Sequence, residues 1–125
     1  MKLSPLKSGN KAEKFACSFL RSKKYKIILR NFRTKFGEID IIAKDGDVLC
    51  FVEVKFRKNS DFGLPEDFVD LRKQKKIIKT AKIYLAQNQV SDINVRFDVV
   101  AVEPGEKGSY KARLIQDGFQ GGNYE

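Results

Sequence analysis

The sequence lacks histidine altogether and has only two cysteines among its 125 residues. Without histidine no Ser-His or Cys-His nucleophile pair can form, and a conventional zinc site is not expected. Cys17 and Cys50 lie inside expected helix and strand segments, so we expect buried, reduced thiols and no disulfide framework. Apolar runs are far shorter than a membrane span, and no apolar segment follows Lys2 and Lys7 as a secretory signal requires. These absences predict a cytoplasmic protein with no membrane segment.

Negative charge is scarce relative to positive charge. The 25 Lys and Arg residues exceed the 16 Asp and Glu residues, which gives a formal net charge of +9. Such an excess favours a polyanionic partner, either nucleic acid or an acidic membrane surface. The length suits one domain with a single core, so we expect one domain over residues 1–125. A basic leader (1–9) and a glycine-rich tail (118–125) are expected to be flexible.

Hydrophobic periodicity predicts two helices and a set of strands. Apolar residues recur at helical spacing in two segments and alternate in others. The expected elements are a helix capped by Asn10 (11–23), strands over 27–32, 36–44 and 47–57, a helix from Pro65 (65–87), a strand over 94–102 and a weaker strand over 112–115. This order, α-β-β-β-α-β-(β), predicts an α/β fold with a mixed central sheet flanked by helices.

Charged side chains are concentrated in the second and third expected strands. Glu38 and Asp40 are two residues apart, as are Glu53 and Lys55, and side chains two apart on a strand share a face. The opposite face of the third strand is apolar and can pack on a helix. These two strands therefore predict a charged site that is held in place by a buried apolar face.

A tight turn at Asp45-Gly46 is expected to join these two strands, because both positions tolerate the positive φ of a type I′ turn. In that register Glu38 lies directly opposite Glu53, and Asp40 lies opposite Phe51. Like charges directly across a ladder destabilise it. A divalent cation with oxygen ligands is the simplest way to offset that repulsion. The expected register thus predicts a metal site.

Carboxylates beside an ammonium group are suited to the hydrolysis of phosphodiester bonds. Carboxylate oxygens are the ligands that Mg²⁺ and Mn²⁺ prefer, and a bound divalent cation can activate water. We expect Asp40 and Glu53 to be ligands, while Lys55 orients the water or stabilises developing negative charge. Glu38 is either a further ligand or a partner of Lys55 or Arg57. The alternative for these acids is an ordinary salt bridge or a solvent-facing pair of strand residues.

The same residues resemble the PD-(D/E)XK motif of the restriction-endonuclease-like superfamily. Asp40 is followed, after twelve residues, by Glu53-Val54-Lys55, and the proline of the motif is absent. Short blocks between residues 9 and 103 also resemble the uncharacterised bacterial YraN family. These blocks are Gly9-x-x-Ala12-Glu13, Arg30-Asn31-Phe32-Arg33, Gly37-Glu38-Ile39-Asp40, Phe51-Val52-Glu53-Val54-Lys55 and Arg96-Phe97-Asp98-Val99-Val100.

The YraN family is similar in turn to archaeal Holliday junction resolvases, which use a glutamate on the first helix, an aspartate, a Glu-x-Lys pair and magnesium. Carried over residue by residue, this resemblance implies a metal held by Glu13, Asp40 and Glu53 and assisted by Lys55. It also implies a restriction-endonuclease-like fold and a possible homodimer. The alternative for Glu13 is an ordinary acid on the helix surface.

A basic face is expected beside the apolar face of the second helix, which includes Leu71 and Ile77. It is either an ordinary solvated face or a surface that binds phosphate groups. Asp98 is expected to form an ion pair with Arg96 or to cap a loop. The residues of the basic face are Arg72, Lys75, Lys76, Lys79 and Lys82.

Three functions are compatible with these features. The leading hypothesis is an endonuclease, dependent on Mg²⁺ or Mn²⁺, that acts on structured or damaged DNA, with RNA as the less favoured substrate. The second is a nucleic-acid-binding module that keeps a nuclease-like fold without turnover. The third is an interaction protein whose basic surface meets an acidic partner protein.

Overall fold

The structure is a computed structural model, and it describes residues 7–57 and 69–119, with side chains from residue 11 onward. The expected leader up to residue 6, the start of the second helix at Pro65 and the tail from residue 120 lie outside these ranges. The elements are α1 (Lys7–Ser22), β1 (Lys26–Thr34), β2 (Gly37–Asp45), β3 (Val48–Phe56), α2 (Leu71–Gln87), β4 (Asn94–Pro104), the short 3₁₀ helix η3 (Glu106–Gly108) and β5 (Tyr110–Phe119).

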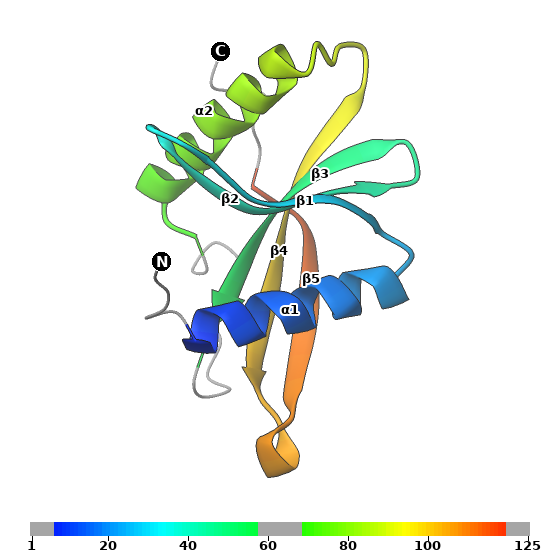
Figure 1. The fold of residues 1–125 in the computed structure, drawn as a ribbon, viewed down its shortest axis with the longest axis vertical. Helices are drawn as coiled ribbons and strands as arrows, with labels where there is room; N and C mark the ends of the chain where they lie inside the picture. The colour runs from blue at the N-terminus through cyan, green and yellow to red at the C-terminus, as the bar shows by residue number, and fades with distance from the viewer. Residues whose placement is uncertain (1–6, 58–68, 120–125) are drawn as a thin grey trace.

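The strands form one mixed sheet in the order β1-β2-β3-β4-β5. Strands β3 and β4 are parallel, because α2 returns the chain to the end of the sheet at which β3 begins. The other neighbouring strands are antiparallel. Figure 1 shows the strands as a strongly twisted sheet, with the β4–β5 hairpin extending beyond α1. The predicted α/β class and element order are confirmed.

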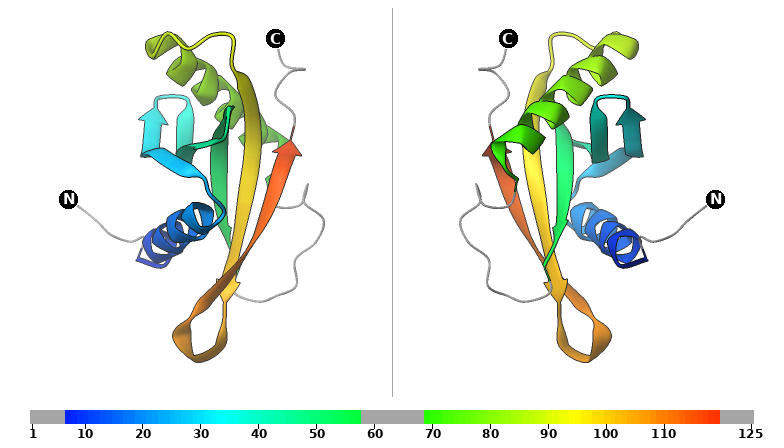
Figure 2. Two further views of the ribbon diagram at one scale, coloured as in Figure 1. Left: turned by 90° about the vertical axis from the view of Figure 1, so that its right-hand side faces the viewer. Right: turned by 90° about the vertical axis from the view of Figure 1, so that its left-hand side faces the viewer.

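The two helices cover two separate apolar clusters. Side chains of α1 pack with Val52 and Cys50 of β3, whereas side chains of α2 pack with Phe51, because successive strand residues face opposite sides. Figure 2 shows α1 and α2 at different levels of the twisted sheet. Cys17 and Cys50 are buried and free, as the sequence predicts. Neither helix in the described part of the chain has the length and apolar character that a membrane crossing demands.

Both helices begin at positions that differ from the expected ones. α1 starts at Lys7, so Asn10 lies inside the helix and does not cap it. α2 is described from Leu71, and Asp70 is its N-cap, with a carboxylate that accepts a 2.9 Å hydrogen bond from the Lys73 N–H. The prediction that Leu71 belongs to the apolar face is wrong, because this residue is 55% exposed at the start of the helix.

The register of the β2–β3 hairpin also differs from the expected one. Asp45 pairs with Val48, so the two turn residues are Gly46, at φ +62°, and Asp47. The prediction that Glu38 faces Glu53 is therefore wrong by two residues. The physical reason is that Asp45 accepts a 2.9 Å hydrogen bond from Arg96 Nη2 on β4, which holds it as the last residue of the strand. A shift of two residues leaves every side chain on its predicted face.

A buried polar network joins Tyr25, which immediately precedes β1, to β4, β5 and the last residue of β2. Asp98 is fully buried and accepts hydrogen bonds from Tyr25 O–H at 2.8 Å and from Arg96 Nε at 2.9 Å. Gln116 Nε2 donates to Tyr25 Oη at 3.0 Å, and Arg96 Nη2 connects the group to Asp45. The predicted Asp98–Arg96 ion pair is confirmed.

Candidate functional site

The candidate site lies where strands β2 and β3 diverge, which we call the fork. The β2–β3 ladder ends at the pair Ile41 and Val52, after which β2 stays paired with β1 and leaves β3. Asp40 is the next residue on β2, and its Oδ2 accepts a 2.8 Å hydrogen bond from the Val54 N–H. The start of β2 touches α2, since a Cβ atom on Gly37 would lie 3.1 Å from Thr80 Oγ1. The fork therefore opens between β2, β3 and the start of α2.

Four carboxylates from three elements meet at this fork. One oxygen from each of Glu13 on α1, Glu38 on β2 and Asp40 on β2 lies within 4.8 Å of the others. Glu53 on β3 is 4% exposed and lines two cavities together with Asp40. We call these four residues the carboxylate cluster. The structure thus brings together the three residues that the resemblance implies as ligands and adds Glu38.

Three basic side chains form ion pairs with the carboxylate cluster. Arg30 Nη2 lies 3.4 Å from Glu13 Oε1, and Arg33 Nε lies 3.5 Å from Glu38 Oε1. The shortest pair joins Lys73 Nζ on α2 to Glu53 Oε2 at 2.7 Å. Glu38 pairs with Arg33, whereas the sequence suggested Lys55 or Arg57 as its partner.

The electrostatic environment disfavours ionisation of two members of the carboxylate cluster. Burial and the neighbouring charges of Glu53, Glu13 and Glu38 together raise the pKa of Asp40 to about 8, against the opposing hydrogen bond from the Val54 N–H. Burial also raises the pKa of Glu13, although Arg30 opposes that shift. The folded chain therefore holds these acids together against their mutual repulsion.

This repulsion predicts an unusual dependence of stability on pH. Between pH 4 and 8 the unfolded chain loses the Asp40 proton that the native chain retains, so the free energy of unfolding falls as pH rises. We expect a loss of at least about 1 kcal/mol over this window, the value of one pKa unit. Urea unfolding of the wild-type protein and of Asp40→Asn between pH 5 and 8.5, with a chelator present, measures this fall in the free energy of unfolding. Equal slopes for the two proteins would contradict the prediction.

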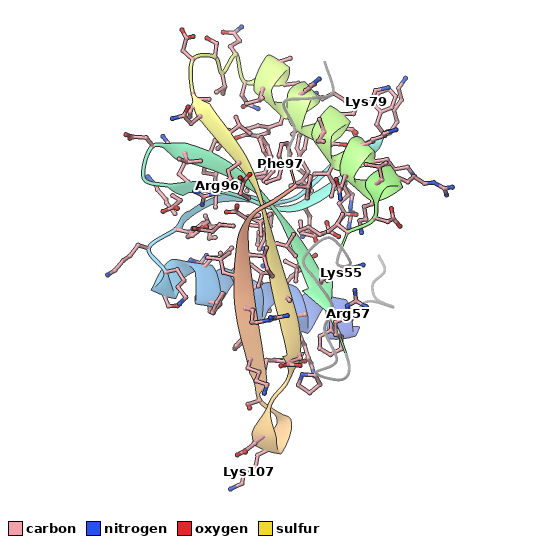
Figure 3. The ribbon with its side chains drawn as sticks, turned by 180° about the vertical axis from the view of Figure 1, so that it is seen from behind. Lys55, Arg57, Lys79, Arg96, Phe97 and Lys107 are labelled. Atoms are coloured by element: carbon pink, nitrogen blue, oxygen red, sulfur yellow. The ribbon has the colours of Figure 1, made fainter. Side chains whose placement is uncertain are left out.

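Lys55 faces the same cavity as the carboxylates. A cavity of about 240 Å³ is lined by Glu13, Asp40, Glu53 and Lys55, and Lys73 also reaches it. Figure 3 shows Lys55 and Arg57 near the end of β3. Lys55 is half-buried at the cavity wall. The role of Arg57 stays a prediction.

The residues of the predicted basic face of α2 lie in different surroundings. Arg72 and Lys76 line a second cavity of about 280 Å³ beside Glu38 and Asp40. Lys79 projects from α2 (Figure 3), and its Nζ lies 3.9 Å from the centre of the Phe36 ring. Lys75 and Lys82 are exposed on the helix. The half of the helix nearest its start is therefore the half that meets the carboxylate cluster.

Sequence reasoning missed Lys73, whose ammonium group is the closest cation to Glu53 among the ion pairs of the described residues. A signal was available in its spacing. Lys73 precedes the buried Ile77 by four residues, so the two side chains lie on the same helix face. A lysine on that face reaches toward the sheet.

The fold and this site define an α/β protein with a mixed five-stranded sheet and a carboxylate-lined cleft where two strands diverge. The chain belongs to the uncharacterised protein family UPF0102, whose model matches residues 12–102. UPF0102 is the YraN family, so the resemblance seen in the sequence is confirmed.

Relatives of this family match along most of their length. The UPF0102 protein of Symbiobacterium thermophilum is 46% identical over 111 residues, which are 89% of this chain and 94% of that protein. The UPF0102 protein of Syntrophus aciditrophicus is 43% identical over 115 residues, 92% of this chain and 90% of that one. That of Geotalea daltonii is 45% identical over 111 residues, with coverage of 89% and 87%.

Proposed function

We propose that the protein is a metal-dependent nuclease that hydrolyses phosphodiester bonds in structured or damaged DNA. The observation that carries the proposal is the convergence of Glu13, Asp40, Glu53 and Lys55, from α1, β2 and β3, on one cavity. A surface that only binds phosphate groups gains nothing from clustered carboxylates, because like charges repel. A hydrolytic site that depends on Mg²⁺ or Mn²⁺ uses such carboxylates as ligands.

The donor set fits Mg²⁺ or Mn²⁺. Glu13, Asp40 and Glu53 line one cavity and offer carboxylate oxygens, which these hard cations prefer as ligands. Burial and the neighbouring acids raise the pKa of Asp40, and a divalent cation would favour its ionised form. We assign Glu13, Asp40 and Glu53 as the residues that would hold the ion. When bound, a divalent cation supplies an activated water and charge relief at the phosphoryl group.

The protein side chains have separate roles in this proposal. The hydrogen bond from the Val54 N–H fixes the Asp40 carboxylate between the two strands. Lys55 extends from the same strand as Glu53 into the shared cavity, where its ammonium group orients the attacking water or stabilises negative charge. Glu38, anchored by Arg33, adds charge at the rim.

Nucleic acid as the partner is supported by basic residues that continue from the cleft. A third cavity, of about 340 Å³, is lined by Arg33, Lys35 and Lys76, and it shares Gly37, Glu38 and Lys76 with the second cavity. Basic side chains along this path can follow a phosphate backbone, with an affinity that falls as salt concentration rises. The resemblance to resolvases favours DNA over RNA.

A non-catalytic nucleic-acid-binding module is the second candidate. Its supporting observation is that Glu13 and Glu53 already have cationic partners, Arg30 and Lys73. In that case the carboxylate cluster is an internal ion-pair group. Binding of DNA would then be independent of magnesium and would survive loss of Asp40.

Cleavage of labelled single strands, duplexes, flaps, forks and four-way junctions in Mg²⁺ or Mn²⁺ tests the proposal. The matched control is the Asp40→Ala/Lys55→Ala variant, purified identically. We expect metal-dependent cleavage by the wild-type protein that this variant loses. If neither protein cleaves but both bind DNA equally, the binding module replaces the nuclease.

A further inference from the structure

The ion pair of Lys73 with Glu53 is the tightest cationic contact of the carboxylate cluster. Its 2.7 Å distance compares with 3.4 Å for Arg30 on Glu13 and 3.5 Å for Arg33 on Glu38. The two partners differ in burial, since the Glu53 side chain is 4% exposed and the Lys73 side chain is 47% exposed. Lys73 therefore reaches a buried carboxylate from the solvent side.

The backbone of Lys73 is held in place, whereas its side chain can reach either of two cavities. The Asp70 carboxylate accepts a hydrogen bond from the Lys73 N–H and so fixes the first turn of α2. The side chain lines both the cavity that contains Lys55 and the cavity that contains Arg72 and Lys76. Its long aliphatic chain can carry the ammonium group from one cavity to the other without moving the helix.

We propose that Lys73 is an exchangeable counter-ion that holds Glu53 when the site lacks a divalent cation and yields Glu53 when the cation enters. This inference rests on the proposed function. A buried carboxylate without a partner is strongly unfavourable, so Glu53 requires a cation in either state. A divalent ion on Glu53 repels the ammonium group, and the half-exposed side chain of Lys73 can withdraw into solvent.

The exchange links metal binding to substrate binding. A phosphate group in the cavity beside Arg72 and Lys76 attracts the withdrawn Lys73 and so favours the state in which Glu53 is available to metal. By reciprocity, bound metal then raises the affinity for the phosphate group to the same extent. Lys73 therefore makes the free protein a weak metal binder and the protein–nucleic acid complex a stronger one.

Binding of Mn²⁺ to the protein without nucleic acid, followed by the EPR signal of the free ion, tests this proposal. Lys73→Met removes the competing charge and keeps the aliphatic chain. We expect about tenfold tighter Mn²⁺ binding for this variant, equivalent to 1.4 kcal/mol. Lys73→Arg, which retains the charge, should bind Mn²⁺ as the wild-type protein does.

A matched control removes another lysine that pairs with a largely buried glutamate. Lys111 Nζ on β5 lies 3.6 Å from Glu103 Oε2, and neither residue belongs to the carboxylate cluster. Lys111→Met changes the net charge equally, so unaltered Mn²⁺ affinity in this variant shows that the Lys73 effect is local. A tenfold gain in both variants would overturn the proposal, because it would show a general charge effect.

The outcomes separate this inference from the proposed function. If Lys73→Met binds Mn²⁺ no more tightly than the wild-type protein, the exchange is overturned, whatever the cleavage assay shows. Should Lys73→Met fail to fold, Lys73→Gln provides the same test with an amide that still donates to Glu53. Failure of the nuclease proposal is read separately, from cleavage by the Asp40→Ala/Lys55→Ala variant.

Discussion

Replacing Asp40 by asparagine is expected to lower metal-dependent cleavage at least about 100-fold, the typical scale for loss of an essential catalytic group, and to stabilise the metal-free protein. The amide cannot serve as an anionic ligand, although it can still accept the hydrogen bond from the Val54 N–H. It also removes a buried charge that lies beside Glu53, Glu13 and Glu38. We expect the free energy of unfolding at pH 9 to rise by about 1 to 3 kcal/mol.

The comparison of two pH values makes this prediction specific. At pH 5 Asp40 is already protonated in the native chain, so Asp40→Asn should have little effect on urea unfolding there. Asp47→Asn, at the exposed β2–β3 turn, is the control for removing an acid without removing repulsion. A variant that is less stable than the wild-type protein at pH 9 would show that Asp40 is favourably paired.

Replacing Asp98 by alanine should lower the free energy of unfolding by roughly 3 to 5 kcal/mol, the usual range when one partner of a buried ion pair is removed. The substitution leaves the Arg96 guanidinium without its Asp98 partner and deprives the Tyr25 hydroxyl and the Asp117 N–H of an acceptor. Arg96 belongs to β4 and Asp117 to β5, and Tyr25 immediately precedes β1, so three parts of the sheet lose a shared contact.

Urea unfolding of Asp98→Ala and Asp45→Ala at pH 7 provides the measurement. Asp45 also accepts a hydrogen bond from Arg96, but its side chain is partly exposed, so its removal should reduce stability less. Asp98→Asn should be intermediate, because it keeps an acceptor and loses the charge. A loss below about 1 kcal/mol for Asp98→Ala would indicate that water replaces the carboxylate, as it does at surface pairs.

Most elements of this fold were predictable because their periodicity is local. Strands were predicted at the positions of all five observed strands, although the last was expected only over 112–115 and β5 spans Tyr110–Phe119. The apolar face of β3 at Val52 was confirmed because side-chain parity survives a register error of two residues. The register itself was not predictable from the hairpin. It depends on Arg96, which is far along the chain and holds Asp45 in the strand.

The candidate site was predictable in composition but not in arrangement. Asp40, Glu53 and Lys55 were identified from spacing, and the structure places them at one cavity. Glu13 required the family resemblance, because a helix wheel only places it at the edge of an apolar stripe. Lys73 escaped notice because many lysines occupy α2, and only the packing of α2 on the sheet selects the one that reaches Glu53.

Strand β3 connects a stabilising feature of this fold, the Asp98 network, with a destabilising one, the carboxylate cluster. One end is tied, through the β2–β3 turn, to the Asp98 network, and the other end opens at the fork where the carboxylates repel. A genetic selection for chains that regain folding after damage at Asp98 should therefore return suppressors at the opposite end, in the carboxylate cluster, because distant changes in stability add. Such suppressor variants would be more stable, and on the proposed function they would have lost nuclease activity.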